Sequence, residues 1–172
     1  MLIIRCTSKL LKELSVHKSN IYDFIQPDNL LGSWYANVII INRRKCLLFV
    51  NDKTLFTFLI PEIKKSDLKN IKELFIENLK SNLIFLGINE LVIEQICEEY
   101  KEYEIGKTLS RSVLGSMTDY GRCYKLENQD TEGQLADSIL QINSEMNKMP
   151  MGAIDYSNGE RMLINFLDKR AT

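Results

Sequence analysis

The stretch that most constrains the fold is residues 34–60, WYANVIIINRRKCLLFVNDKTLFTFLI, which is dense in β-branched, aromatic and leucine side chains. This composition favours strands, and two polar clusters divide the stretch as turns do. The pattern predicts three adjacent strands at Trp34–Asn42, Lys45–Asn51 and Thr54–Ile60, with turns at 42–44 and 51–53. We therefore expect an antiparallel sheet at the centre of the molecule.

The first two of these strands are apolar on both faces. Because successive side chains of a strand point to opposite faces, Val38 and Ile40 share one face and Ile39 and Ile41 share the other. Strands of this kind are covered on both faces. The cover is expected to be helices on each side, or helices on one side and a second subunit on the other. The second alternative predicts that the protein self-associates as a homodimer.

Strand and helix signals outside the central stretch complete the predicted architecture. A short apolar run at Leu2–Cys6 is expected to join the sheet, and another strand is expected near Tyr103–Lys107. Apolar residues at helical spacing predict five or six helices. Strands followed by helices are typical of the α+β class. The sequence therefore predicts a single α+β domain over residues 1–172, with an antiparallel sheet of four or five strands surrounded by these helices.

The charge balance restricts the kinds of partner. The chain has 22 Lys and Arg residues against 23 Asp and Glu residues, a formal net charge of −1. Domains that bind nucleic acid are usually visibly basic, so the overall charge argues against a broad nucleic-acid surface while allowing a local basic patch. The N-terminus has no signal-peptide pattern, and no window approaches the roughly 18 apolar residues of a membrane span. A cytoplasmic protein without a membrane partner is expected.

The cysteines and the single histidine limit metal chemistry. Cys6, Cys46, Cys97 and Cys123 are far apart in sequence and form no CxxC pair, and His17 is the only imidazole. This spacing does not fit a structural zinc site. We expect no metal and no cofactor. We also expect Cys6, Cys46 and Cys97 to be buried free thiols.

Five motifs, together with the opening LIIRCTSKLLKEL, carry a resemblance to a known family. They are Trp34–Asn37 (WYAN), Arg43–Asn51 (RRKCLLFVN), Thr54–Phe58 (TLFTF), Arg111–Asp119 (RSVLGSMTD) and Pro150–Gly152 (PMG). Together they resemble an uncharacterised bacterial domain family that also occurs joined to plasmid-encoded ORF-3-like proteins of mobile elements. The likeness covers nearly the whole chain. It implies a bacterial or phage domain with a link to mobile elements, and it implies no particular chemistry.

The most suggestive polar constellation lies at a predicted strand-to-helix junction. It consists of Lys107, Ser110, Arg111, Ser112 and Ser116. A helix N-terminus offers unpaired N–H groups and the positive end of the helix dipole, so anions bind there readily. The two cations and the hydroxyls would add charge and donors for a phosphate group. The alternative is an ordinary helix start with Ser110 as its cap.

A glycine in the middle of this helix is unusual. Gly115 costs about 1 kcal/mol relative to alanine in a helix, which indicates close approach of another backbone or a ligand. The preceding GKT at 106–108 lacks the earlier glycine of a phosphate-binding loop, so it forms no Walker motif.

Other candidates are a hairpin tip, an imidazole and an aromatic ring. Arg43 and Arg44 beside Lys45 form a basic tip that suits phosphate, or that simply keeps the tip soluble. His17 is the only residue available for imidazole acid–base chemistry. Trp34, at a strand start, is placed either to stack a base or to pack on a loop.

These features predict a non-catalytic binding module of a bacterial mobile element, phage or defence system. The expected partner is a phosphate-bearing ligand, such as a nucleotide or nucleic acid, or a protein. The alternative is an enzyme that acts on a nucleotide or nucleic acid, with a site around Ser110–Ser116 and His17. No hydrolase, nuclease, kinase or deaminase motif identifies catalytic residues. Binding is favoured because acid–base residues are sparse at the ends of the predicted strands and helices.

Overall fold

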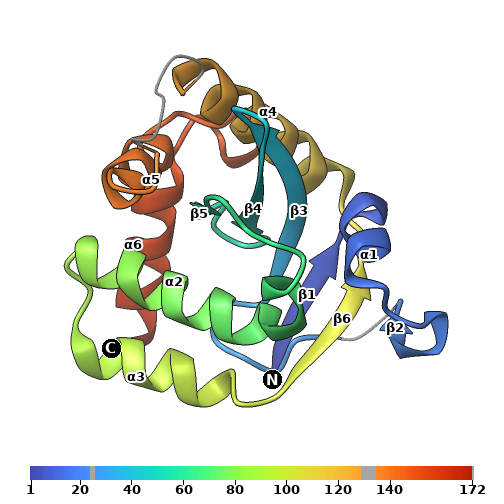
Figure 1. Ribbon diagram of the computed structural model, residues 1–172. Coiled ribbons are helices and arrows are strands. Elements are labelled where there is room, and N and C mark those ends of the chain that lie inside the picture. The colour runs from blue at the N-terminus through green and yellow to red at the C-terminus, as the bar shows by residue number, and fades with distance from the viewer. Residues whose placement is uncertain (24–25, 129–134, 172) are drawn as a thin grey trace.

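The chain is built around one six-stranded sheet (Figure 1). The computed structural model describes residues 1–23, 26–128 and 135–171. In spatial order the strands are β2 (Ile21–Tyr22), β6 (Tyr103–Lys107), β1 (Leu2–Cys6), β3 (Ser33–Ile41), β4 (Arg44–Asn51) and β5 (Thr57–Ile60). The sheet is mixed, because one half is antiparallel and the other half is parallel.

The antiparallel half confirms the three strands predicted in the central stretch. β3 pairs with β4 along its length, and β4 pairs with β5. Asn42 and Arg43 join β3 to β4, and their φ angles are +47° and +64°. A two-residue hairpin turn of type I′ requires positive φ at both positions. β5 begins at Thr57 rather than Thr54, because Leu55 turns the chain with φ at +57°.

The other half of the sheet corrects the prediction that the sheet is antiparallel. β1 pairs in parallel with both β3 and β6, and β2 pairs in parallel with β6. Parallel neighbours need a crossover connection, usually helical. Helix α1 (Ser8–Leu14) and the 3₁₀ turn η1 (Lys18–Asn20) connect β1 to β2, while α2 (Ile71–Phe85) and α3 (Glu90–Glu99) precede β6. A short apolar strand carries no signal for its partner or direction, which explains the error.

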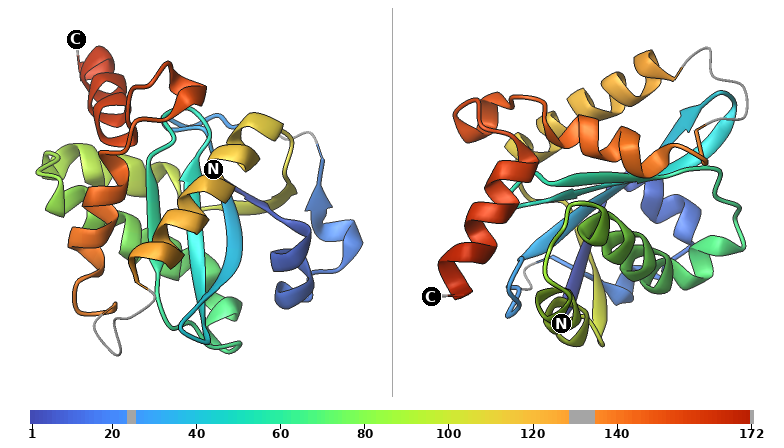
Figure 2. Two further views of the ribbon diagram at one scale, coloured as in Figure 1. Left: turned by 90° about the horizontal axis from the view of Figure 1, so that it is seen from above. Right: turned by 90° about the vertical axis from the view of Figure 1, so that its left-hand side faces the viewer.

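Helices cover both faces of the antiparallel half (Figure 2). On one face α1, α2, α3 and α6 (Gly159–Ala171) enclose a core in which Trp34 and Phe75 pack edge to face. On the other face lie α4 (Arg111–Glu127) and α5 (Ile139–Asn147). The sheet therefore needs no second subunit as a cover, and the argument that predicted a homodimer loses its basis.

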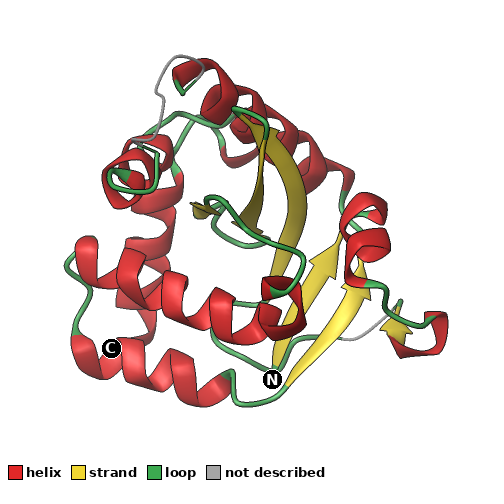
Figure 3. Cartoon of the chain, in the orientation of Figure 1, coloured by secondary structure: helices red, strands yellow, loops and turns green. Residues whose placement is uncertain are grey.

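The remaining helical segments are short 3₁₀ turns, and polar side chains cap three of the helices. Two further 3₁₀ turns are η2 (Asp67–Asn70) and η3 (Gly152–Ile154), and Figure 3 shows the helices surrounding the strands. The side chains of Thr7, Asn89 and Ser110 each accept a backbone N–H at a helix start. Within the described ranges, no helix has both the length and the apolar character needed to cross a bilayer.

Helix α5 covers the β5 edge of the sheet through two asparagines. Asn147 accepts from the Thr57 N–H at 2.8 Å and donates to the Thr57 carbonyl at 2.7 Å. Asn143, one turn earlier, accepts from the Leu59 N–H at 2.9 Å. Thr57 and Leu59 are two residues apart, so their backbone groups point to the same side of β5. Side-chain amides thus take the place of a neighbouring strand.

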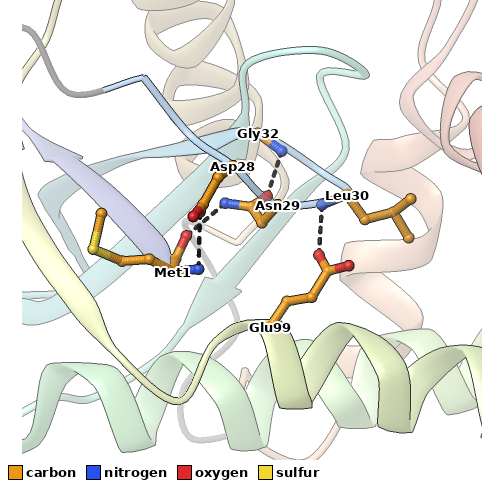
Figure 4. A network of polar contacts seen from close by, with 6 residues as sticks. All are labelled: Met1, Asp28, Asn29, Leu30, Gly32 and Glu99. Atoms are coloured by element: carbon orange, nitrogen blue, oxygen red, sulfur yellow. Dashed lines mark hydrogen bonds and ion pairs between the residues drawn. The ribbon is translucent and has the colours of Figure 1, made fainter.

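The segment before β3 is fixed to the amino end of β1 and to α3 (Figure 4). Its polar network contains Met1, Asp28, Asn29, Leu30, Gly32 and Glu99. Asn29 donates to the Met1 carbonyl at 2.7 Å and accepts from the Gly32 N–H at 2.7 Å. Glu99, at the end of α3, accepts the Leu30 N–H. These contacts fix the segment before β3 to the amino end of β1 and to the end of α3.

Candidate functional site

The carboxyl ends of β1 and β6 form a natural place for a ligand. The strands are parallel neighbours, with Cys6 opposite Lys107. β1 continues into α1 on one face of the sheet, whereas β6 continues into α4 on the other, and Figure 1 shows α1 beside the end of β6. Ligands of open α/β sheets commonly bind where neighbouring parallel strands connect to opposite faces. The predicted residues Lys107 and Ser110–Ser112 lie at this place.

The start of α4 is largely hydrogen-bonded within the chain. The Tyr35 hydroxyl accepts from the Leu109 N–H at 3.2 Å and from the Ser110 N–H at 2.8 Å. The Ser110 hydroxyl accepts from the Val113 N–H at 3.3 Å. Oxygens of the protein therefore occupy three of the donors that an anion would use. Ser110 serves as a helix cap, which is the alternative that the sequence left open.

The other predicted residues of α4 are not gathered in one site. Arg111 and Ser112 are exposed on the first turn, and Arg111 forms no ion pair among the described residues. Ser116 is only 5% exposed. A Cβ atom built on Gly115 would meet no described atom within 4 Å, so the predicted close approach of another backbone at this glycine is wrong.

A groove beside the end of β6 brings Lys107 and His17 together. It is open to solvent and has a volume of ≈ 860 Å³. Its lining consists of Ser8, Leu11, Lys12, Ser15, Val16, His17, Lys18, Ile21 and Lys107. Helix α1 and the segment that leads from it into η1 provide most of this lining. The groove contains three lysines and no carboxylate, and we call it the lysine groove.

Two carboxylates beside the lysine groove form ion pairs with lysines. Asp23 forms an ion pair with Lys107 at 2.8 Å. Glu13, on α1, forms an ion pair with Lys45 at 2.7 Å, and this hydrogen bond holds the pKa of Glu13 below its ordinary value. Lys12 and Lys18 make no ion pair within the described part of the chain. The groove is therefore a local excess of positive charge on a protein that is nearly neutral overall.

His17 is held by neighbours in its own loop. Its Nδ1 accepts from the Ser19 N–H at 3.3 Å and lies 2.7 Å from the Ser19 hydroxyl. Because Nδ1 accepts a backbone N–H, the neutral imidazole carries its proton on Nε2. Both partners of this nitrogen belong to Ser19, so no carboxylate orients the ring through it. In this tautomer Nε2–H is a hydrogen-bond donor.

The remaining predicted residues lie elsewhere. Arg43 is exposed at the β3–β4 turn, several residues beyond the Cys6 end of β1, and Arg44 forms an ion pair with Glu62. Trp34 is fully buried, and its Nε1 donates to the Tyr100 hydroxyl at 2.9 Å. Burial raises the pKa of Tyr100. The prediction that Trp34 stacks a ligand is therefore corrected, because its ring belongs to the core.

The comparisons with known proteins give a family without a described activity. A family model described as "Domain of unknown function (DUF6933)" matches residues 3–161. The chain belongs to this family. No curated protein and no solved structure matches the chain. The matched region of this DUF6933 domain contains the whole lining of the lysine groove.

The sequence of this DUF6933 domain did not predict that Lys12 and Lys18 belong to the site. Lys12 lies in SKLLKEL, where the spacing of Leu10, Leu11 and Leu14 already indicated an outward position for it. What the sequence did not indicate is that β2 pairs with β6 and so carries the 16–18 segment back toward α1.

Among the described residues, no group of three His, Cys, Asp or Glu side chains is arranged to hold a metal ion.

Proposed function

We propose that this domain is a non-catalytic binding module for a phosphate-bearing ligand, whose anionic group lies in the lysine groove. One observation carries the proposal: Lys12, Lys18, Lys107 and His17 line a single groove that contains no carboxylate. A cleft lined by charge of one sign raises the local concentration of oppositely charged ligands. Phosphate groups suit such a groove because lysine binds them as a compact point charge.

The three lysines come from separate parts of the chain. Lys12 lies on α1, Lys18 begins η1 and Lys107 ends β6. A group of anionic oxygens in the groove would therefore meet positive charge from more than one side. Lys12 and Lys18 are exposed and make no ion pair among the described residues, so none there has to be broken for them to bind an anion. Lys107 is paired with Asp23 and must give up or share this partner.

Binding is favoured over catalysis by the surroundings of His17. An enzyme that uses this imidazole as a base would gain from a carboxylate that orients the ring. The contacts of Nδ1 are instead with Ser19. The resemblance to domains joined to mobile-element proteins supports a role in a bacterial mobile element, phage or defence system. A homodimer is not part of the proposal, because one chain forms the groove.

Calorimetric titration with inorganic triphosphate tests the proposal. The wild-type protein is expected to bind triphosphate at low ionic strength and to bind it less tightly as salt is added. Lys107→Ala is expected to reduce affinity about tenfold or more, since hydrogen bonds to charged groups contribute roughly 1.5–3 kcal/mol. Lys80→Ala, which removes an exposed lysine of α2, is the matched control and should leave affinity unchanged.

Two results would contradict the proposal. One is the absence of triphosphate binding at low salt, and the other is an equal loss of affinity in Lys80→Ala and Lys107→Ala. The variant Arg111→Ala separately tests whether the start of α4 belongs to the site. Unchanged affinity in that variant would confine the site to the lysine groove.

A further inference from the structure

We infer that the ligand of the lysine groove is a mononucleotide and that its base lies against Tyr103 in an adjoining groove. This inference rests on the proposed function and names the class of ligand. It depends on a second groove, which lies on the other side of residues 15–17. There the surface changes from cationic to aromatic and polar, with Glu104 as its one carboxylate among the described residues.

A second groove adjoins the first one at His17. Its volume is ≈ 470 Å³, and it shares Ser15, Val16 and His17 with the lysine groove. The rest of its lining is Asn20, Tyr22, Tyr103, Glu104 and Ile105. Each hollow by itself is of the size that small-molecule ligands occupy. One ligand therefore has room to place different groups on either side of His17.

The strand β6 sets the direction in which such a ligand lies. Tyr103, Ile105 and Lys107 are alternate residues of β6, so their side chains share one face of the sheet. Ile105 lies between them and is largely buried. The backbone from Tyr103 to Lys107 spans about 13 Å at the usual strand rise. This span suits a flat ring, a sugar and a chain of phosphates laid end to end.

The second groove offers the groups that recognise a nucleobase. Tyr103 is 39% exposed and Tyr22 is 43% exposed, which is a high exposure for such large aromatic side chains. Bases stack on exposed aromatic rings with little dependence on sequence. The Asn20 amide can donate to and accept from the edge of a base. Glu104 and, through its pairing with Gly106, Tyr22 lie on the opposite face of the sheet from Tyr103. Tyr103 and Asn20 are therefore the groups that this end of the combined groove offers to a base.

The distribution of charge favours a mononucleotide over a nucleic-acid strand. A strand carries a phosphate at every nucleotide, so its binding groove needs cations along its whole path. The lining of the second groove contains Glu104 and neither lysine nor arginine. All three lysines lie on the other side of His17. A ligand with its phosphates at one end and an uncharged ring at the other matches this arrangement.

A comparison of the affinities for inorganic triphosphate and for nucleotides tests the inference. ATP and GTP are each titrated into the wild-type protein and into Tyr103→Ala, Asn20→Ala and, as a matched aromatic control, Tyr156→Ala, whose ring is 79% exposed. At least one nucleotide is expected to bind about tenfold more tightly than triphosphate, because stacking on an aromatic ring contributes roughly 1–3 kcal/mol. Tyr103→Ala should abolish that advantage while leaving triphosphate affinity unchanged, which also shows that the variant is folded.

The outcomes separate this inference from the proposed function. If triphosphate and both nucleotides bind equally and Tyr103→Ala changes neither, the base site is wrong while the phosphate site stands. If triphosphate does not bind at all, the proposed function itself is wrong. If a single-stranded oligonucleotide binds more tightly than every mononucleotide, the ligand class is wrong. A nucleotide advantage that survives Tyr103→Ala and Asn20→Ala would likewise overturn the placement of the base.

Discussion

Lys107 Nζ lies 2.8 Å from Asp23 Oδ1, so a carboxylate that directly follows β2 holds one lysine of the proposed groove. The two side chains are 56% and 47% exposed. A bound anion must compete with this carboxylate for Lys107. The ion pair is therefore a built-in limit on how tightly the groove can bind phosphate.

Replacing Asp23 should strengthen anion binding. Asp23→Asn removes the competing charge with little change of shape, and we expect affinity for inorganic triphosphate to rise about two- to fivefold, the scale of an exposed ion pair. Titration calorimetry at low salt measures the change. Asp119→Asn, which removes the partner of Arg122 on α4, is the control and should have no effect. A weaker affinity in Asp23→Asn would mean that the carboxylate positions Lys107 for the ligand instead of competing with it.

The contact between Asn147 and Thr57 should contribute strongly to stability. Asn147→Ala leaves the N–H and the carbonyl of Thr57, both buried, without their partner. We expect a loss of about 2–5 kcal/mol in the free energy of unfolding, because each stranded buried group costs roughly 1–3 kcal/mol. Denaturant unfolding measures the loss. Gln141→Ala, on the exposed side of the same helix, should change stability by less than about 0.5 kcal/mol.

Gly115→Ala should stabilise the protein by about 0.5–1 kcal/mol. The position is exposed in the middle of α4, and an added Cβ meets nothing within 4 Å. Gly87→Ala is a sharp contrast, since it too has open space but its φ is +80°, so alanine there should destabilise. Thermal unfolding of both variants distinguishes the two cases. A loss of stability in Gly115→Ala would contradict the open space beside this position of α4.

Leu48→Ala should destabilise the fold by about 2–5 kcal/mol, as truncations in filled cores do. Leu48 is fully buried in β4 and faces the core under α4. The midpoint of denaturant unfolding reports the loss. Leu91→Ala, at an exposed position of α3, provides the comparison. A midpoint equal to that of wild type would contradict the packing of α4 on the sheet.

Thiol labelling should separate the four cysteines into two classes. Cys6 and Cys46 are buried, whereas Cys97 and Cys123 are partly exposed, and all four are free. Burial raises the pKa of each thiol, so little thiolate exists at neutral pH. We expect slow labelling of Cys97 and Cys123 and no labelling of Cys6 and Cys46 until the protein unfolds. Rapid reaction of four thiols in the native protein would contradict this.

The antiparallel half of the sheet could be predicted because its signals are local. The turn at Asn42–Arg43, the density of β-branched and aromatic residues in β3 and β4, and the cap at Ser110 all involve residues close in sequence. Even β1 and β6 were placed at their observed bounds. Their parallel pairing was missed, because strand direction and partner depend on where the intervening helices pack. That information lies in contacts between residues about one hundred positions apart, such as Cys6 with Lys107.

The candidate site was predicted only in part, because its residues come from distant parts of the chain. Lys107 and His17 are 90 residues apart in sequence, and only the pairing of β2 with β6 brings them to one groove. The sequence left both alternatives open for Trp34, because a tryptophan at a strand start has the same sequence signature whether it faces a pocket or a core. Tyr35 was the unforeseen element at α4: its hydroxyl, from β3, occupies amides that the sequence left for an anion.

The amide pairing of α5 with β5 also bears on whether the folded protein can associate through the edges of its sheet. An exposed edge strand is a template on which another molecule can add its own strand and begin a fibril. The segment TFLI of β5 is apolar and well suited to such growth, yet Asn143 and Asn147 already occupy its outer backbone groups. At the opposite edge, β2 has only two residues and offers almost no template. Aggregation of this protein should therefore start from transient detachment of α5 and not from the native surface.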